Sequence, residues 1–237
     1  QTQELKNGLM QQLLTQGIGH TKFKSSELGE IPESWRIEEI RNITTYVDYR
    51  GKTPVKVSEG VFLITARNIK RGKIDYETSK EYVSKESYST IMSRGVPRIG
   101  DVLITTEAPL GEVASIDNEN VVLAQRIIKY RGNKEIIDNG YLKYSFLSAY
   151  FQEELEKEST GSAVKGIKGS RLHKIKILIP PLPEQQKIAE ILSTVDEKIT
   201  SLQNKKQTYQ QLKKGLMQQL LTGKIRVQTS QTEPSLA

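Results

Sequence analysis

Residues 180–222 read PPLPEQQKIAEILSTVDEKITSLQNKKQTYQQLKKGLMQQLLT, and this stretch decides how the rest of the chain is organised. The prolines at its start stop a preceding strand and are tolerated in the first turn of a helix. Beyond them, one seam advances in alternating steps of four and three residues, which is a heptad pattern. The seam consists of Ile188, Leu192, Val195, Ile199, Leu202, Lys206 and Tyr209, with Lys206 as its polar interruption. We therefore predict one long coiled-coil helix within residues 183–224.

A helix of this length must bury its seam against something. About 39 residues at 1.5 Å per residue span roughly 58 Å, which is more than one domain needs. The apolar stripe continues, with a shift in phase, through Leu212, Leu216 and Leu220. The helix can pack onto its own domain or onto a partner helix, and its length favours a partner.

The end of this helix is repeated near the start of the chain. Leu5–Thr15 reads LKNGLMQQLLT and Leu212–Thr222 reads LKKGLMQQLLT, so that only Asn7 and Lys214 differ. The first copy predicts a short helix within residues 1–17, because it has the same stripe. We interpret the chain as one repeat unit preceded by the end of another. Such units are usually paired with a tandem twin or with a second copy.

Residues 18–182 have the mixed pattern of an α+β domain. Alternating or continuous apolar runs predict its strands, and one helical stripe predicts a single internal helix over Gly140–Glu158. The predicted strands are Val61–Ala66, Asp101–Thr106, Val113–Ile116, Val121–Tyr130 and the alternating run through Ile175, Ile177 and Ile179. The predicted fold class is α+β, with one mixed or antiparallel sheet domain between the short and the long helix. Residues 225–237 are predicted to be disordered.

The bulk composition narrows the class of protein. The chain has no cysteine, which excludes a disulfide framework and a thiolate metal site. No apolar run approaches 18 residues and no signal-peptide pattern opens the sequence, so we expect a soluble cytoplasmic protein. The net charge of +7 favours a polyanionic partner such as DNA.

Two basic clusters are candidate DNA contacts. Arginine and asparagine side chains can read guanine and adenine edges, and a glycine-rich loop can present backbone N–H groups to phosphate. The first cluster follows a predicted strand and consists of Arg67, Asn68, Lys70, Arg71 and Lys73, with Arg50 and Lys52 on an earlier loop. The second lines the loop 161–169 and consists of Lys165, Lys168 and Arg171. The alternative interpretation is a solvated basic face.

Catalytic and metal-binding patterns are not convincing. Gly51-Lys52-Thr53 resembles the end of a phosphate-binding loop, but the upstream glycine is missing because position 46 is tyrosine. The only two histidines, His20 and His173, have no second ligand at helical spacing. We predict no catalytic residue and no metal site.

Three carboxylates lie near predicted strand ends: Asp101, Glu107 and Glu112. Carboxylates in such places are more often solvated or ion-paired than catalytic. The sequence therefore offers no convincing catalytic site at these carboxylates.

Several phrases together resemble the specificity subunit of Type I restriction–modification systems. They are LGEIPESW at 28–35, GDVLIT at 100–105, PLG at 109–111, LAQRI at 123–127, TGSAVKGI at 160–167 and ILIPPLPEQQKI at 177–188. Together with the long helix that follows, the resemblance extends from residue 3 to about residue 226.

The resemblance implies a sequence-specific DNA reader without chemistry of its own. Residues 18–182 would be a target-recognition domain that reads one half of a bipartite site, and paired antiparallel helices would set the spacing. The residues expected to pair the helices are Leu5, Leu9, Leu13, Ile188, Leu192, Val195, Ile199, Leu202, Tyr209, Leu212, Leu216 and Leu220.

The resemblance also implies the partners. Modification subunits would methylate adenine N6 with S-adenosylmethionine, and a restriction subunit would add cleavage driven by ATP with Mg²⁺. No cofactor is then expected on this chain.

Two questions stay open at this level. Family subunits usually carry two recognition domains and two helices, so we expect either half of such a subunit or a natural half-subunit that works as a dimer. The competing functional hypothesis is a coiled-coil adaptor that binds protein instead of DNA. A self-sufficient nuclease or methylase lacks the residues to support it.

Overall fold

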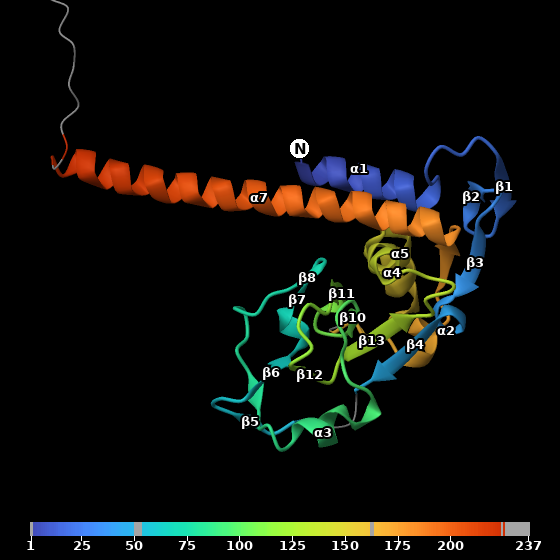
Figure 1. The fold of residues 1–237 in the computed structure, drawn as a ribbon, viewed down its shortest axis with the longest axis horizontal. Coiled ribbons are helices and arrows are strands. Elements are labelled where there is room, and N and C mark those ends of the chain that lie inside the picture. Colours follow the sequence, from blue (N-terminus) through green and yellow to red (C-terminus); the bar gives the residue numbers. More distant parts are fainter. Residues whose placement is uncertain (1, 50–53, 162–163, 224, 226–237) are drawn as a thin grey trace, which may run out of the picture. The chain divides into compact units, whose positions relative to one another are not determined.

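The computed structural model describes residues 2–49, 54–161, 164–223 and 225 (Figure 1). The chain divides into two compact units, which are essentially Gln3–Leu192 and Ser193–Ala237. Apart from residue 225, the tail predicted to be disordered lies outside the described residues. None of the helices in the described part combines the length and the apolar content that crossing a bilayer requires.

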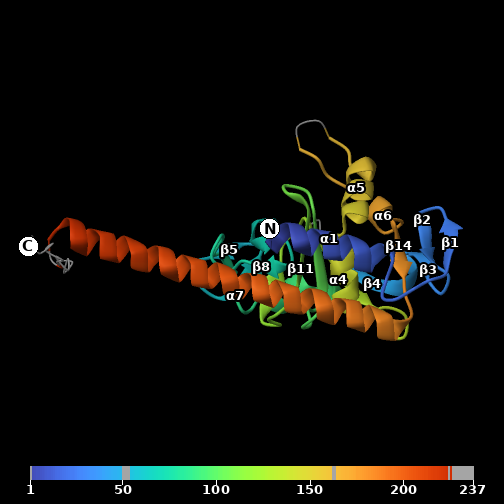
Figure 2. The same cartoon turned by 90° about the horizontal axis from the view of Figure 1, so that it is seen from above.

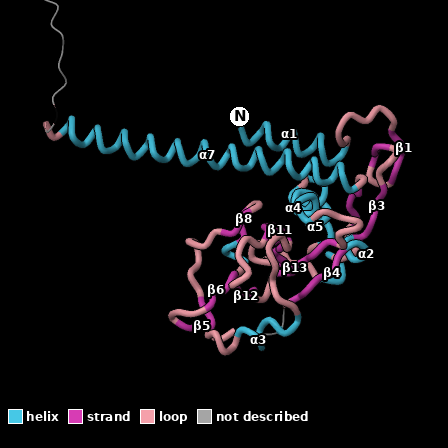
Figure 3. Tube along the Cα trace, viewed as in Figure 1, coloured by secondary structure: helices cyan, strands magenta, loops and turns pink. Residues whose placement is uncertain are grey.

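Runs of short strands are separated by helices, and the longest helix ends the described part of the chain (Figure 3). The helices are α1 Thr2–Thr15, α2 Ile40–Ile43, α3 Tyr88–Ile91, α4 Asn139–Leu147, α5 Ala149–Glu158, α6 Gly169–Leu172 and α7 Leu182–Leu221, with 3-10 turns η1 Ala66–Asn68 and η2 Met92–Arg94. The strands are β1 Phe23–Ser26, β2 Gly29–Pro32, β3 Arg36–Glu39, β4 Thr44–Asp48, β5 Lys56–Val57, β6 Val61–Ile64, β7 Ile69–Lys70, β8 Lys73–Ile74, β9 Tyr82–Val83, β10 Val102–Thr106, β11 Leu110–Ser115, β12 Val121–Leu123, β13 Ile127–Gly132 and β14 Lys176–Ile179.

Two four-stranded sheets form the centre of the first unit. One is antiparallel in the order β11-β10-β13-β4, and the other has the order β12-β6-β9-β5 with β12 and β6 parallel. Strand β10 is buried on both faces: Val102 and Ile104 lie in one apolar cluster, whereas Leu103 lies in the other. This alternation follows from the two-residue period of a strand. The predicted α+β class with mixed and antiparallel sheets is confirmed.

The internal helix predicted over 140–158 is two helices. Helix α4 ends at Leu147, and Ser148 adopts an extended backbone conformation with φ −65° and ψ 150°. Its hydroxyl accepts a hydrogen bond from the Phe151 N–H at 3.2 Å and so caps α5. The prediction of one helix was wrong because the apolar stripe continues across a capped break.

The strand predicted over 121–130 is also two strands. Arg126 has φ +78°, a left-handed conformation that no regular strand contains. The chain therefore leaves one sheet after β12 and enters the other as β13. Continuous apolar character was misleading here, because both strands are buried.

The start of α7 belongs to the core of the first unit. Ile188 and Leu192 are fully buried in the same apolar cluster as Trp35. Both were predicted to pair helices, and here they share one apolar cluster with Met10, Leu13 and Leu14 of α1 as well as with residues of the sheet domain. Helix α7 itself is continuous over 40 residues, as the heptad pattern predicts.

Two neighbouring polar side chains attach the start of α7 to the domain. The Glu184 carboxylate accepts hydrogen bonds from the Ile18 N–H at 2.9 Å and the Trp35 Nε1–H at 3.0 Å. It also lies 2.8 Å from His20 Nε2. One carboxylate thus joins the segment after α1, the entry into the sheet domain and the first turn of α7.

Gln185 makes the second attachment and is completely buried. Its Oε1 accepts a hydrogen bond from the Asp138 N–H at 2.9 Å, which connects α7 to the N-cap of α4. Its Nε2 donates to the carbonyl oxygens of Ile136 at 2.9 Å and Pro180 at 2.8 Å. All three partners are backbone groups that have to be satisfied once they are buried.

We predict that Gln185→Leu lowers the free energy of unfolding by roughly 3 kcal/mol, because it leaves a buried N–H and two carbonyls without partners. The measurement is urea denaturation followed by the emission of Trp35, the only tryptophan. The control is Gln186→Leu at the exposed neighbouring position, which we expect to change the free energy by less than about 0.5 kcal/mol. Equal effects of the two substitutions would contradict this assignment.

Candidate functional site

A short basic hairpin carries Lys70, Arg71 and Lys73 of the first predicted cluster. Strands β7 and β8 pair with Ile69 opposite Ile74 and Lys70 opposite Lys73. The two isoleucines are buried and anchor the hairpin in the core. Residues directly opposite each other point to the same face, so the two lysines lie side by side. Two like charges in that position oppose pairing, and a bound anion would relieve this repulsion.

The tip of the hairpin is held by backbone contacts. The Gly72 N–H donates to the Val113 carbonyl at 2.6 Å, and Gly72 has φ +102°, which suits glycine. The Arg71 N–H donates to the Glu112 carboxylate at 2.7 Å, while the arginine residue itself is exposed. Arg67 in η1 is exposed as well.

The cations of this surface form no close ion pair with another described residue. Within the described residues, no ion pair involves the side chain of Arg67, Lys70, Arg71 or Lys73. The hairpin and η1 therefore present four positive charges to solvent from a rigid base. We call these four residues the hairpin cluster.

Asn68 does not belong to this surface. It is fully buried, and its Oδ1 accepts hydrogen bonds from the Thr65 N–H at 2.9 Å and the Thr65 hydroxyl at 2.8 Å. Its Nδ2 donates to the carbonyls of Asp75 and Ser79, both at 2.9 Å. The prediction that Asn68 contacts DNA is wrong in this structure, because its amide groups are used to hold the loop together.

The second predicted cluster is partly neutralised. Lys165 forms an ion pair with Glu156, and the Arg171 guanidinium lies 3.9 Å from the Glu158 carboxylate. Lys168 is exposed at the start of α6. Such exposed pairs contribute little to stability, so a phosphate can compete for these cations. Arg50 and Lys52, with the loop that resembles a phosphate-binding loop, lie outside the described residues.

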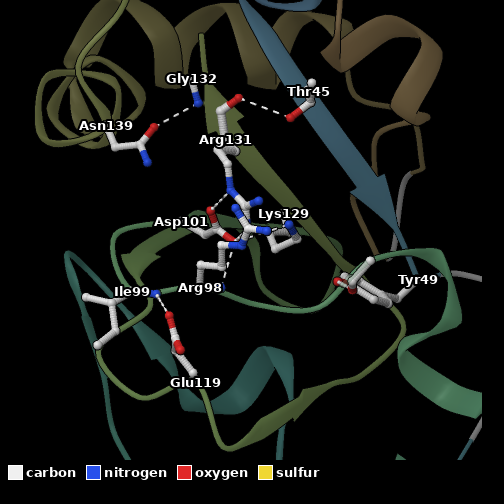
Figure 4. A network of polar contacts seen from close by, with 11 residues as sticks. Thr45, Tyr49, Arg98, Ile99, Asp101, Glu119, Lys129, Arg131, Gly132 and Asn139 are labelled. Carbon is white, nitrogen blue, oxygen red and sulfur yellow. Dashed lines mark hydrogen bonds and ion pairs between the residues drawn. The ribbon is translucent and has the colours of Figure 1, made fainter. Parts of the chain in front are cut away.

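Asp101 is the centre of a buried charge network (Figure 4). Arg131 donates to both carboxylate oxygens, with Nε at 2.6 Å and a terminal nitrogen at 2.7 Å. The Lys129 ammonium lies 3.1 Å from the same carboxylate, and the Arg98 N–H donates to it at 2.9 Å. Asp101 is only 1% exposed. The network connects the turn before β10 to β13, so the sequence-based expectation of an ion-paired carboxylate is confirmed.

Burial and the neighbouring charges shift the pKa values of Asp101 and Lys129 in this network. Burial alone would raise the pKa of Asp101, but the hydrogen bonds from Arg131 and Arg98 and the Lys129 charge outweigh it and lower that pKa below its ordinary value. Burial lowers the pKa of Lys129, and the attraction to Asp101 offsets this only in part.

We predict that Asp101→Asn lowers the free energy of unfolding at pH 7 by roughly 3–5 kcal/mol, because it leaves Lys129 and Arg131 without their counter-ion. Since the folded pKa of Asp101 is lowered, its stabilising contribution is present above the unfolded pKa and is lost as the pH falls through the folded value. The difference between wild type and variant should therefore shrink below about pH 4 in urea denaturation series.

The control for this series is Glu77→Gln, which removes an exposed carboxylate paired with Lys80. We expect it to change stability by less than about 1 kcal/mol at any pH. A wild-type-to-Asp101→Asn difference that stays constant with pH would show that the carboxylate charge is not the stabilising feature.

The remaining polar candidates have structural partners. Glu107 forms an ion pair with Arg126 at 2.8 Å, and Glu112 accepts the Arg71 N–H. His173 is buried, its Nδ1 lies 2.6 Å from the Tyr130 hydroxyl, and its ring stacks on Tyr46 at 3.6 Å. In the described part of the chain, no three histidine or carboxylate residues come together as a metal site.

The helix-pairing residues fall into two groups. In α1 the buried face contains Met10, Leu13 and Leu14, whereas Leu5 is 72% exposed and Leu9 is partly buried. The buried face of α1 is therefore rotated about the helix axis from the predicted stripe, because the domain packs against the side that carries Met10, Leu13 and Leu14. In α7, Val195 and Ile199 are partly buried, and the exposed positions are Leu202, Tyr209, Leu212, Leu216 and Leu220.

Sequence reasoning missed three polar residues that position these helices. Glu184 and Gln185 make the attachments described above, and Lys6 is buried with its ammonium 6.0 Å from the centre of the Tyr144 ring. The signal for Lys6 was available, because lysine recurs as Lys213 in the second copy of the repeat. The signal for Gln185 was its position three residues before Ile188, the first seam residue, because residues three apart lie on the same face of a helix.

The sequence of this chain is similar to those of known proteins. Residues 32–213 match the family described as Type I restriction modification DNA specificity domain. The chain is 35% identical over 234 residues to the Type I restriction enzyme MjaVIII specificity subunit of Methanocaldococcus jannaschii, covering 94% of this chain and 54% of that protein. It is 24% identical to the EcoKI specificity subunit of Escherichia coli, covering 83% of this chain and 44% of that protein.

Solved structures show the same fold. The HsdS subunit from Thermoanaerobacter tengcongensis superposes with a TM-score of 0.58 at 19% identity, over 86% of this chain and 45% of that one. A chain from a study of complex assembly and conformational transition of the type I R-M system gives 0.63 at 19% identity, over 90% of this chain and 49% of that one. The chain spans about half the length of the curated relatives that it matches.

Proposed function

Because this chain belongs to the family of Type I restriction modification DNA specificity domains, we propose that it reads one half of a bipartite DNA target and directs partner subunits to it. The observation that carries the proposal is the family match over residues 32–213, which includes the sheet domain and most of α7. The net charge of +7 supports a polyanionic ligand.

In this proposal the chain supplies recognition and its partners supply chemistry. Modification subunits would methylate adenine N6 with S-adenosylmethionine after flipping the base out of the duplex. A restriction subunit would use ATP and Mg²⁺ for cleavage. The chain's own task is to place these partners at a sequence, with its helices paired to those of a tandem twin or a second copy.

The direct test is methylation mapping of DNA exposed to the complex of this chain with its modification subunits. The proposed function expects methylated adenines within one interrupted sequence, because each recognition domain reads one half-site. Methylation or binding without any sequence preference in that complex would end the proposal.

The hairpin cluster is our proposed contact with the DNA backbone. Its four cations lack ion-pair partners among the described residues, and its base is anchored by buried Ile69 and Ile74. Lysine binds phosphate as a point charge, without base discrimination. The second cluster, with Lys165 and Arg171 already paired to glutamates, would contribute less.

We predict that Lys70→Gln with Lys73→Gln weakens DNA binding by similar factors for target and non-target sequences. Each phosphate contact contributes about 0.9 to the slope of log affinity against log salt, so the slope should fall by roughly two. The measurement is a salt titration of DNA binding by the complex with modification subunits.

The matched control is Lys80→Gln with Lys157→Gln, which removes the same charge from exposed lysines that are already paired with Glu77 and Glu154. We expect its salt slope to equal that of the wild type. If the Lys70 and Lys73 variant also keeps the wild-type slope, the hairpin does not contact phosphate. Binding that hardly depends on salt in any variant would favour the protein-binding adaptor instead.

The length of α7 should determine the gap between half-sites. Inserting four residues near Gln203 lengthens the helix by roughly 6 Å. We predict that the preferred gap then grows by about one or two base pairs, since B-DNA rises 3.4 Å per base pair. Methylation mapping with the variant complex measures the gap, and an unchanged gap would show that the helix does not set the spacing.

A further inference from the structure

Arg126 occupies a backbone position that suits glycine better than arginine. It lies between β12 and β13, where the chain leaves one sheet and enters the other, and its φ is +78°. Residues with a side chain are strained in this left-handed region, and such residues gather at ligand-binding sites. Glycine adopts the same conformation without strain. The presence of an arginine therefore indicates that its side chain has a role.

Segments far apart in the sequence meet at the backbone of Arg126. Its carbonyl oxygen accepts a hydrogen bond from the Thr106 N–H at 2.8 Å, and the Thr106 carbonyl accepts one from the Ile167 N–H at 3.0 Å. Thr160 and Gly166 exchange two backbone hydrogen bonds, of 2.8 and 3.0 Å, across the loop that connects α5 to α6 (Figure 2). Thr106 and Ile167 are buried, so the core determines the position of Arg126.

One carboxylate lies beside the Arg126 side chain. The Arg126 Nε is 2.8 Å from the Glu107 Oε1, and the two side chains are 48% and 44% exposed. Glu107 is itself held by a backbone bridge to Gly166. No described residue accepts a hydrogen bond from the two terminal nitrogens of the guanidinium, which carry most of its N–H donors. The pair therefore presents an oriented set of donors to solvent.

The carboxylate makes Arg126 a poor contact for phosphate. A phosphate contact gains free energy by releasing counterions from DNA, which requires a net positive charge on the protein. Arg126 and Glu107 cancel each other's charge, whereas the four residues of the hairpin cluster are all cationic. The pair still offers directional hydrogen bonds, and these are what the reading of a base edge requires.

The Arg126 site and the hairpin cluster are connected through one strand, β11. Thr106, which donates to the Arg126 carbonyl, is paired with Leu110 at the start of this strand. The hairpin tip is held three residues further on, where the Gly72 N–H donates to the Val113 carbonyl. Three residues of a strand span roughly 10 Å, and the major groove of B-DNA is about 12 Å wide. The hairpin can therefore contact phosphates at the edge of a groove while Arg126 reaches the bases inside it.

We propose that Arg126 is a specificity-determining residue that reads a guanine in the target half-site, and that Glu107 positions its guanidinium. Guanine presents the acceptors O6 and N7 side by side in the major groove, and one arginine can donate to both. This inference rests on the proposed function, in which the chain reads one half of a DNA target. It adds the base that one residue recognises and the residue that directs it.

Replacing Arg126 by glycine tests this assignment without straining the backbone, because glycine suits the observed φ. In complex with the modification subunits, we expect Arg126→Gly to lose the requirement for guanine at one position of the half-site, while the other positions keep their requirements. Affinity for the target DNA should fall about ten- to hundredfold. The slope of log affinity against log salt should stay that of the wild type. Methylation mapping and salt titrations of binding measure these effects.

Arg41 provides a matched control, because its side chain is 49% exposed and its Nε also lies beside a carboxylate, that of Glu39. We expect Arg41→Ala to keep the wild-type sequence preference. Trp35 emission reports whether each variant is folded. If Arg126→Gly is not, Arg126→Lys takes its place, because lysine keeps the charge and lacks the two-pronged donor group.

The positioning role of Glu107 is tested at the same base position. Glu107→Ala should weaken the guanine requirement, because the guanidinium loses the group that directs it. Glu107→Gln keeps an oxygen for the guanidinium and should retain more of the requirement than Glu107→Ala. A Glu107→Ala complex with the full guanine requirement would remove Glu107 from the site.

The outcomes separate this inference from the proposed function. A wild-type complex without any sequence preference defeats the proposed function and this inference with it. A wild-type preference that the folded Arg126→Gly variant leaves intact overturns only the role of Arg126. An equal loss of affinity for target and non-target DNA, with a smaller salt slope, also overturns it, because that result identifies a phosphate contact.

Discussion

The rest of the structure depends on the attachment of α7 to the sheet domain through Glu184 and Gln185. Both residues lie in the first turns of α7, and their contacts hold this start of the helix on the domain. Here these contacts are directional hydrogen bonds to buried backbone groups and to the Trp35 indole. Apolar burial of Ile188 and Leu192 adds free energy, whereas the hydrogen bonds determine the rotation of the helix.

Inside the sheet domain, too, apolar contacts and polar contacts have separate roles. Its two apolar clusters supply most of the stabilisation, and a single carboxylate, Asp101, orients β10, β13 and the preceding turn by pairing with Arg131 and Lys129. Polar groups inside the domain are satisfied by the protein itself, as Asn68 illustrates. The cations of the hairpin cluster are different, because no ion pair with a described residue neutralises them. A rigid frame with unneutralised positive charge is the arrangement that backbone contact with DNA requires.

The repeat gives the chain a second kind of surface. Residues 5–15 and 212–222 are identical except at Asn7 and Lys214, and Met10, Leu13 and Leu14 are buried whereas Met217, Leu220 and Leu221 are exposed. The hairpin cluster and the repeat share no residue.

The sequence by itself determined the long helix, the short repeat helix, the main strands and the family, because these depend on periodicity and on contiguous motifs. Residues 121–130 and 140–158 show the limit: a left-handed Arg126 and a capping Ser148 interrupt patterns that are periodic throughout. Only the tertiary structure decided that Asn68 is internal, that Met10, Leu13 and Leu14 form the covered face of α1, and that Ile188 and Leu192 belong to the domain core. The physical reason is that local pattern specifies backbone conformation, whereas burial depends on which surfaces meet.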